Sequence, residues 1–506
     1  MKLGKSALLG SAASLIVVAG AQAADLPVRA AAPVVEYVRV CPAYGAGFFF
    51  IPGTETCLRI SGRVRAEYRY VDPETRVGDA LGWRARGQLN LDARTATAWG
   101  TLRTFIRYEL TRNSGNYGVV QQQWAGQAGQ ALTVDLNKAF IQFAGITAGR
   151  ATSFFDFYAN ALNWGNFVGT GSDTYGNDPV VLAYTATFGG GFSATISLED
   201  PASRRVTSTV LPPVPGAFGT PPLPPGFVFP FITAGAAGTT APGQFFFAGQ
   251  RMPEIVGNVR VDQAWGSAFL SGALHQLISS NLLVPNPAGP FALGPRVIPE
   301  TKYGFAITGG LKLNLPFIAP GDVLWLQATY ADGAMSYLGH GNARALQQGG
   351  QSPLVGNFAD AYVDAFGRTR TVTGWNIHAA FLHYWTPQLR SAFFGTYGRV
   401  DVPDFATSAL VVPPLAPAGT PAFVLPGNFI GDLRMWQVGA NLIWSPVRDL
   451  DIGVEVLYGS IRADRRVVDL TSSFISPGVG VVGAPFVRTI RGDDSLDARL
   501  RIQRDF

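Results

Sequence analysis

The stretch CPAYGAGFFFIPGTETCLRISGRVRAEYRY, residues 41–70, decides the fold of this chain. From residue 58 onward, apolar or small residues alternate with residues that are mostly charged. The two sets are Leu58, Ile60, Gly62, Val64, Ala66, Tyr68 and Tyr70 against Arg59, Ser61, Arg63, Arg65, Glu67 and Arg69. Because successive side chains of a strand point to opposite faces, the pattern predicts a β-strand with one apolar face and one charged face.

The same alternation recurs along the chain. Strands are predicted at 81–95, 100–112 and 496–506, and each carries arginines opposite its apolar residues. About sixteen such strands can be counted, and the links between them alternate between short and long. Tight links are predicted at 144–145, 189–191, 264–266, 319–321, 386–388 and 446–449, and long ones at 113–131, 153–179, 200–254, 280–301, 333–371, 402–432 and 464–496.

Composition indicates that the apolar face meets lipid. Only 14% of residues are charged and the mean hydropathy is +0.17, whereas soluble chains have about 25% charged residues. Beyond residue 23 there is no run of 18 or more apolar residues, so we expect no transmembrane helix. These features are typical of an all-β fold, a transmembrane antiparallel β-barrel with short periplasmic turns and long extracellular loops. The last strand would then pair with the first, because an open sheet edge is not tolerated in lipid.

The N-terminus has the features of a secretory signal. Lys2 and Lys5 precede an apolar run that ends in small residues at 21–23. We expect a signal peptide at 1–23, a periplasmic segment at 24–57 and the barrel at 58–506. Loss of the two lysines would lower the formal net charge from +5 to +3, and so mild a charge does not favour a nucleic-acid partner.

Cysteine and tryptophan positions agree with an exported membrane barrel. The only cysteines are Cys41 and Cys57, for which an oxidising compartment favours a disulfide, although two free thiols are the alternative. Eight of the ten tryptophans lie beside predicted turns or at strand starts, as an aromatic girdle at the membrane interfaces requires. They are Trp83, Trp99, Trp265, Trp325, Trp375, Trp385, Trp436 and Trp444.

Signatures of catalysis are weak. The four histidines, His275, His340, His378 and His383, form no zinc-binding pair on a helix. A lipid-facing hydrolase would need a serine beside His383, which shares the outward face of Trp375, and the sequence alone singles out no such serine. We therefore expect no enzyme, no cofactor and no metal.

Charge on the predicted inner face is the strongest functional signal. We call this group the basic wall: Arg63, Arg65, Arg84, Arg86, Arg103, Arg107, Arg499 and Arg501. Guanidiniums in a narrow passage concentrate the electric field, whereas the alternative is an ordinary solvated strand face.

An acidic counterpart is predicted in the link 153–179. It carries Asp156, Asp173 and Asp178, and we expect it to fold into the lumen as a constriction opposite the basic wall, the alternative being an ordinary outer loop. The transverse field between acid and base would favour small hydrated solutes. The proline-rich link 200–254 cannot form a strand ladder and is expected to be an extracellular loop.

Residues 35–65, VEYVRVCPAYGAGFFFIPGTETCLRISGRVR, closely resemble the start of the alphaproteobacterial porin family of rhizobia, brucellae and their relatives. The likeness extends to AGRATSFFDF (148–157), to SLEDP (197–201) and to the C-terminal Phe506. The resemblance implies a sixteen-stranded homotrimeric porin of the bacterial outer membrane, embedded in lipid and lipopolysaccharide, with its third loop folded into each pore. It also implies that Phe506 is read by the barrel-assembly machinery. The proline-rich link departs from the family pattern.

The sequence therefore predicts a porin for passive diffusion of small hydrophilic solutes and ions, with a mild preference for anions. One alternative is a solute-specific outer-membrane channel, which would need a saturable binding site. Another is a non-conducting surface barrel or adhesin, which would use the long loops and have a plugged lumen.

Overall fold

The computed structural model describes residues 39–73, 79–117, 131–159, 161–165, 178–206, 239–240, 245, 247–285, 293–339, 359–364, 366–404, 431–469 and 488–506. The predicted signal peptide, His340, Asp173 and most of the link 200–254 lie outside these residues. Among the described residues, no helix has the length and the apolar character needed to cross a membrane.

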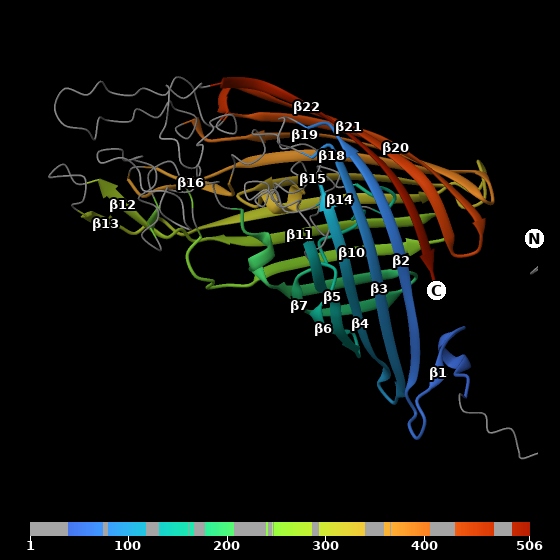
Figure 1. The fold of residues 1–506 in the computed structure, drawn as a ribbon. Coiled ribbons are helices and arrows are strands. Elements are labelled where there is room, and N and C mark those ends of the chain that lie inside the picture. Colours follow the sequence, from blue (N-terminus) through green and yellow to red (C-terminus); the bar gives the residue numbers. More distant parts are fainter. Residues whose placement is uncertain are drawn as a thin grey trace, which may run out of the picture.

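Sixteen antiparallel strands form a closed barrel, which confirms the predicted fold class. In chain order they are β2 (Cys57–Val71), β3 (Leu81–Thr97), β4 (Gly100–Gly115), β5 (Ala131–Phe143), β6 (Ile146–Arg150), β7 (Val180–Gly189), β8 (Phe192–Glu199), β10 (Glu254–Gln263), β11 (Gly266–Leu277), β14 (Lys302–Asn314), β15 (Val323–Asp332), β18 (Thr373–Thr386), β19 (Leu389–Asp401), β20 (Leu433–Val447), β21 (Leu450–Asp469) and β22 (Arg488–Asp505). Each strand pairs with the next, and β22 closes the barrel on β2 (Figure 1).

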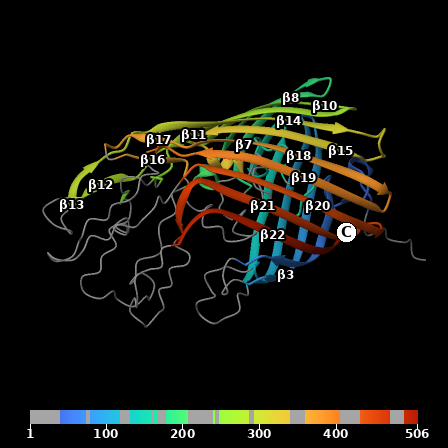
Figure 2. The same ribbon diagram turned by 90° about the horizontal axis from the view of Figure 1, so that it is seen from above.

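The alternation read from the sequence sets the two faces of the barrel. On β2, Val64, Tyr68 and Tyr70 are exposed on the outside, whereas Glu67 and Arg69 are buried on the inside. The predicted tight links also join the strands as expected, and they gather at the end of the barrel where the C-terminus lies (Figure 2). We call this the short-turn end and the opposite end the long-link end.

The bounds of the last two strands differ from the prediction. β21 runs on to Asp469 and β22 begins at Arg488, so both extend into the predicted link 464–496. Beyond a register shift after Arg462, the two strands continue to pair with each other up to Asp469↔Arg488. Sequence alternation is lost in this extension, which is why the pattern alone ended the strands too early.

Several long links contain short elements of their own. These are η3 (Pro201–Arg204), β9 (Thr239–Thr240), β12 (Asn281–Pro285), β13 (Leu293–Val297), η5 (Met335–Leu338), β16 (Ala361–Val363) and β17 (Thr369–Thr371). β9, β12 and β13 form one small sheet, and β16 and β17 form another. The strands β12 and β13 lie beyond the long-link end of the barrel (Figure 1).

A small lobe stands at the short-turn end. It contains η1 (Pro42–Tyr44) and β1 (Phe49–Phe50), and β1 pairs with the start of β2. The disulfide Cys41–Cys57 closes it, which confirms the predicted pairing. Phe48 is 2% exposed and packs against both cysteines, while the guanidinium of Arg94 on β3 lies 4.9 Å from its ring centroid. The lobe is therefore fixed to β3 as well as to β2.

Seven of the eight tryptophans assigned to the girdle have exposed side chains. The exception is Trp325, for which the prediction was wrong. It lies on the inner face of β15 and packs against Phe157 and Tyr158, with ring centroids 5.0 and 5.7 Å away. Its closeness to a turn suggested the membrane interface, but its strand position turns the ring inward.

A large apolar cluster occupies part of the barrel interior at the long-link end, and we call it the dry core. Inward-facing residues of β10, β11, β14, β15, β19, β20 and β21 pack there against residues of the long links. Members include Val256, Leu277, Ala306, Ala331, Val400, Met435 and Ile461 from the strands, and Phe155, Met335, Tyr337, Leu338 and Tyr362 from the links. At its centre the carboxylate of Glu254 contacts His275 at 2.7 Å and accepts from Tyr337 at 2.9 Å. At the long-link end, the side of the barrel interior away from β2 and β3 is thus filled mainly by apolar side chains.

Candidate functional site

Strand register brings the basic wall together. Arg65 lies opposite Arg86, and Arg103 on β4 lies opposite Arg94 on β3. Closure of the barrel then places Arg501 of β22 opposite Glu67 of β2. Because these residues all occupy inward-facing positions, β22, β2, β3 and β4 present one continuous polar surface to the lumen. All eight predicted arginines lie on it.

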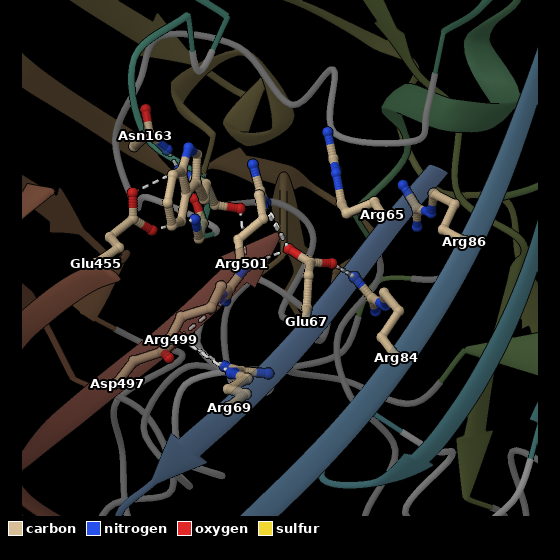
Figure 3. A network of polar contacts seen from close by, with 12 residues as sticks. Arg65, Glu67, Arg69, Arg84, Arg86, Asn163, Glu455, Asp497, Arg499 and Arg501 are labelled. Carbon is tan, nitrogen blue, oxygen red and sulfur yellow. Dashed lines mark hydrogen bonds and ion pairs between the residues drawn. The ribbon is translucent and has the colours of Figure 1, made fainter. Parts of the chain in front are cut away.

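Glu67 lies at the centre of this surface and is fully buried. Its carboxylate accepts from Nη2 of Arg501 at 2.5 Å, and Nη1 of Arg84 lies 3.5 Å away (Figure 3). The Nη1 atom of Arg499 approaches the same carboxylate to 3.9 Å. A single acid therefore holds three buried guanidiniums, which would otherwise repel one another in a region of low dielectric constant.

Further carboxylates pair with the remaining arginines. Asp497 accepts from Arg69 and Arg499 at 2.9 and 3.1 Å, as Figure 3 shows for the neighbourhood of Glu67. The other pairs are Arg86 with Glu109 at 3.1 Å, Arg103 with Asp92 at 3.0 Å, Arg94 with Asp92 at 2.8 Å, and Arg63 with Asp505. When Arg69 and Arg94 are counted with the basic wall, ten guanidiniums lie beside five carboxylates, so positive charge predominates among these residues. The carboxylates are those of Glu67, Asp92, Glu109, Asp497 and Asp505.

The arginines of the basic wall fall into two groups. Arg84, Arg499 and Arg501 are at most 8% exposed and are engaged by Glu67. The other five are partly exposed and line the wall toward the short-turn end: Arg63, Arg65, Arg86, Arg103 and Arg107. In this second group the Nε atoms of Arg65 and Arg107 donate to the neutral amides of Gln503 and Asn90.

Residues 153–159 and 161–165 run through the barrel interior, and we call them the crossing segment. Wall side chains bond its backbone in sequence. Glu199 on β8 accepts from the N–H of Phe154, Gln327 on β15 from that of Tyr158, and Asn441 on β20 donates to the carbonyl of Leu162. At the far end, Glu455 on β21 accepts from Trp164 and Gly165, and Arg499 donates to the carbonyl of Trp164. Buried backbone needs such partners, and here the wall supplies them.

Aromatic rings of the crossing segment fit against glycines of the wall. At Gly310 on β14 an added Cβ would lie 2.3 Å from Phe157, and at Gly453 on β21 it would lie 2.8 Å from Trp164. Either contact is shorter than packed carbon atoms allow, so both positions need a residue without a side chain. The indole of Trp164 also stacks on Arg501, whose Cζ lies 4.4 Å from the ring.

Two of the three aspartates predicted to oppose the basic wall, Asp156 and Asp178, form ion pairs with residues outside it. Asp156 lies 3.7 Å from Arg204, beside the dry core, and Asp178 lies 3.5 Å from Lys138. Burial raises the pKa of the Asp178 carboxyl, an effect that the neighbouring Lys138 ammonium opposes. Asp173 lies outside the described residues. The ion pairs described above join wall arginines to acids of the strands, and strand register fixes those pairs.

Sequence reasoning missed the residues that hold the crossing segment. Glu199 and Glu455 are each 1% exposed, and both bond to backbone rather than to an arginine. Glu199 stands in the SLEDP motif and Glu455 in an alternating strand, so each was visible as an inward-facing acid. No pattern in the sequence shows which distant backbone such an acid will meet.

The structure also places a serine beside His383, which the sequence did not single out. Ser391 on β19 is the cross-strand partner of His383, and Nδ1 of the histidine lies 2.7 Å from Asp322. The hydroxyl of Ser391, however, accepts from the indole of Trp385 at 2.9 Å. No hydrogen bond joins the serine to the histidine in the described part of the chain, and we assign no catalysis to this row. Within the same residues, no group of three or more histidine, cysteine or acidic side chains is placed to hold a metal ion.

Comparisons with known proteins complete the description. A family model described as "Porin subfamily" matches residues 25–475. Porin Omp2a of Brucella ovis is 42% identical over 207 residues, 38% of this chain and 59% of that protein. Porin Omp2b of Brucella canis is 39% identical over 201 residues, 38% of this chain and 53% of that protein. The chain thus matches a little over half the length of these relatives. The outer membrane channel DcaP of Acinetobacter baumannii shares the fold, with a TM-score of 0.51, 14% identity and coverage of 90% of this chain and 99% of that chain.

Replacing Glu67 by glutamine should strongly destabilise the barrel. The substitution keeps the size of the side chain but leaves three buried guanidiniums without their shared acid, at a cost of about 3–5 kcal/mol. Urea unfolding of the protein refolded in lipid vesicles measures the change.

The matched control for this substitution is Asp505→Asn, which removes the acid of a partly exposed pair with Arg63. We expect that control to cost no more than about 1 kcal/mol. Equal effects of the two substitutions would show that Glu67 has no special place in the wall.

Proposed function

This chain belongs to the porin subfamily, and from that premise we propose that it forms a water-filled channel for passive diffusion of small hydrophilic solutes and ions. It is an outer-membrane β-barrel protein. The proposal rests on the contrast between an apolar side and a polar side of the barrel interior. One side is closed by the dry core, while the side formed by β22, β2, β3 and β4 is polar and partly exposed.

The polar side supports a path for hydrated solutes along the short-turn half of the basic wall. Water remains oriented by charged groups there, so a polar solute keeps its hydration whereas an apolar one must displace bound water. The crossing segment narrows the lumen from within and acts as the constriction. Strand carboxylates such as Asp92 and Glu109 supply counter-charges along the path.

A mild preference for anions follows from the charge of the wall. Partly exposed arginines outnumber the carboxylates bonded to them along the path, where Arg63, Arg65, Arg86, Arg94, Arg103 and Arg107 lie beside Asp92, Glu109 and Asp505. Arg65 and Arg107 contribute to it, because both are partly exposed on the inner face. The field of such residues raises the local concentration of anions and lowers that of cations.

The assembly proposed is a homotrimer, as the resemblance to the porin family implies.

We also propose that Phe506 is the residue read by the barrel-assembly machinery. Its backbone N–H and carbonyl pair with Gly62 on β2, and its side chain is 64% exposed. Deletion of Phe506 should therefore lower the amount of folded barrel recovered from isolated outer membranes. An undiminished amount would contradict this role.

Purified protein added to a planar lipid bilayer should give stepwise openings in groups of three. Each step reports one water-filled barrel of the trimer, so single-channel recording checks conduction and assembly together. Silence would favour a non-conducting surface barrel. Saturable block by one sugar or acid would favour a solute-specific channel.

The anion preference should depend on the partly exposed arginines. Under a potassium chloride gradient, we expect the double substitution Arg65→Glu with Arg107→Glu to shift the reversal potential toward cations. The matched control is Arg434→Glu with Arg462→Glu, which makes the same change of charge at exposed positions on the outer face of β20 and β21. Equal shifts from the two pairs, or a cation-selective parent channel, would contradict the proposal.

A further inference from the structure

We propose that Glu455 and Gly453 on β21 form a latch that holds the tip of the crossing segment against the wall and thereby sets the width and ion preference of the channel. Both residues act through the segment, so they are positioning residues. The inference rests on the proposed channel function and goes beyond it, because it names the residues that determine the constriction.

The polar half of the latch is the carboxylate of Glu455. Its Oε2 accepts from the N–H of Trp164 at 2.7 Å and its Oε1 from that of Gly165 at 2.6 Å. Hydrogen bonds from backbone N–H groups to a carboxylate are shorter and stronger than those between neutral groups. Asn441 on β20 supports this carboxylate at 3.2 Å and donates to the carbonyl of Leu162 at 2.8 Å. Leu162, Trp164 and Gly165, at the tip of the crossing segment, are thus tied to the adjacent strands β20 and β21.

The apolar half of the latch is the space above Gly453. The indole of Trp164 lies there, so close that an added Cβ would be 2.8 Å from its Cη2 atom, and the carbonyl oxygen of Leu442 on β20 would lie 2.5 Å from the same Cβ. Gly453 is also the cross-strand partner of Arg501, and the guanidinium of Arg501 stacks on the same indole. The ring is therefore enclosed between the backbone of β21 and an arginine of the basic wall.

Gly165, the residue after Trp164, also lies close to β21. A Cβ added to Gly165 would lie 2.3 Å from Leu457 and 3.3 Å from Glu455. Leu457 follows Glu455 on the same face of β21. The tip thus contacts three successive inward-facing positions of one strand, at residues 453, 455 and 457.

Latching has an electrostatic consequence. Trp164 covers Arg501 with its ring and engages Arg499 through its carbonyl, at 2.8 Å. While the latch is closed, these two guanidiniums face the crossing segment. Its release would free space in the lumen and expose both guanidiniums to the passing solution. Conductance and anion preference should therefore rise together.

Two variants test the latch by different means in the full-length protein. Gly453→Val leaves the charge unchanged and fills the space of the indole, whereas Glu455→Gln removes the charge that binds the two N–H groups. We expect both to raise the single-channel conductance in a planar bilayer and to shift the reversal potential toward anions. The charge-neutral variant matters most, because its shift cannot come from a lost carboxylate.

The matched control is Asp451→Asn, on the same face of β21 four residues before Glu455. Its carboxylate bonds to Arg390 and Ser445 and does not contact the crossing segment. We expect this control to keep the conductance of the parent channel. A change equal to that of Glu455→Gln would overturn the latch, since loss of any acid on β21 would then suffice.

Folding is checked first, by the heat resistance of the barrel on unboiled gels. Should Gly453→Val fail to fold, Trp164→Ala replaces it, because it removes the enclosed ring without altering β21, and the same rise in conductance is expected. Parent-like conductance of the folded variants would overturn the latch while leaving the channel function intact. A silent parent protein would instead overturn the proposed function.

Discussion

Pairing of β22 with β2 is the constraint on which the rest of the structure depends. Backbone N–H and C=O groups cannot be left unpaired in lipid, so the sheet must close on itself. The register of this closure places Arg501 opposite Glu67, and it gathers arginines from both ends of the chain around one acid. A shift of one residue would turn the inward-facing Asp497, Arg499 and Arg501 of β22 toward lipid. The same hydrogen bonds therefore close the barrel and assemble the basic wall.

The two sides of the barrel interior differ in polarity. On the side of β10 to β21 at the long-link end, apolar side chains and the residues of several links exclude water. On the side of β22 to β4 the side chains are charged, and those toward the short-turn end are partly exposed. The crossing segment joins the two sides. Phe155 belongs to the dry core, whereas Trp164 stacks on an arginine of the basic wall. The segment is thus held by apolar packing at one end and by hydrogen bonds to buried carboxylates and amides along its length.

Much of the fold could be predicted from the sequence, because alternation reports directly which face of a strand each residue occupies. It identified the closed barrel, the tight links and all eight arginines of the basic wall. It did not give the partners of those arginines, since pairs such as Glu67 with Arg501 depend on the register of strands far apart in the chain. It also missed Glu455 and Gly453, whose partners are backbone groups and a ring of a link without periodicity. Trp325 shows the same limit, because its position near a turn suggested an interface while its face of the strand decided the outcome.

If water and ions pass along the basic wall and not through the dry core, only a thiol on the wall should react with a soluble reagent. The two native cysteines do not interfere, since they are joined to each other. Arg86→Cys places a thiol on the wall, and Ala306→Cys places one in the dry core. In channels recorded before and after addition of a negatively charged thiol reagent, we expect a rapid fall in current for Arg86→Cys and no change for Ala306→Cys. Reaction at residue 306 with an unreactive residue 86 would contradict a path along the wall.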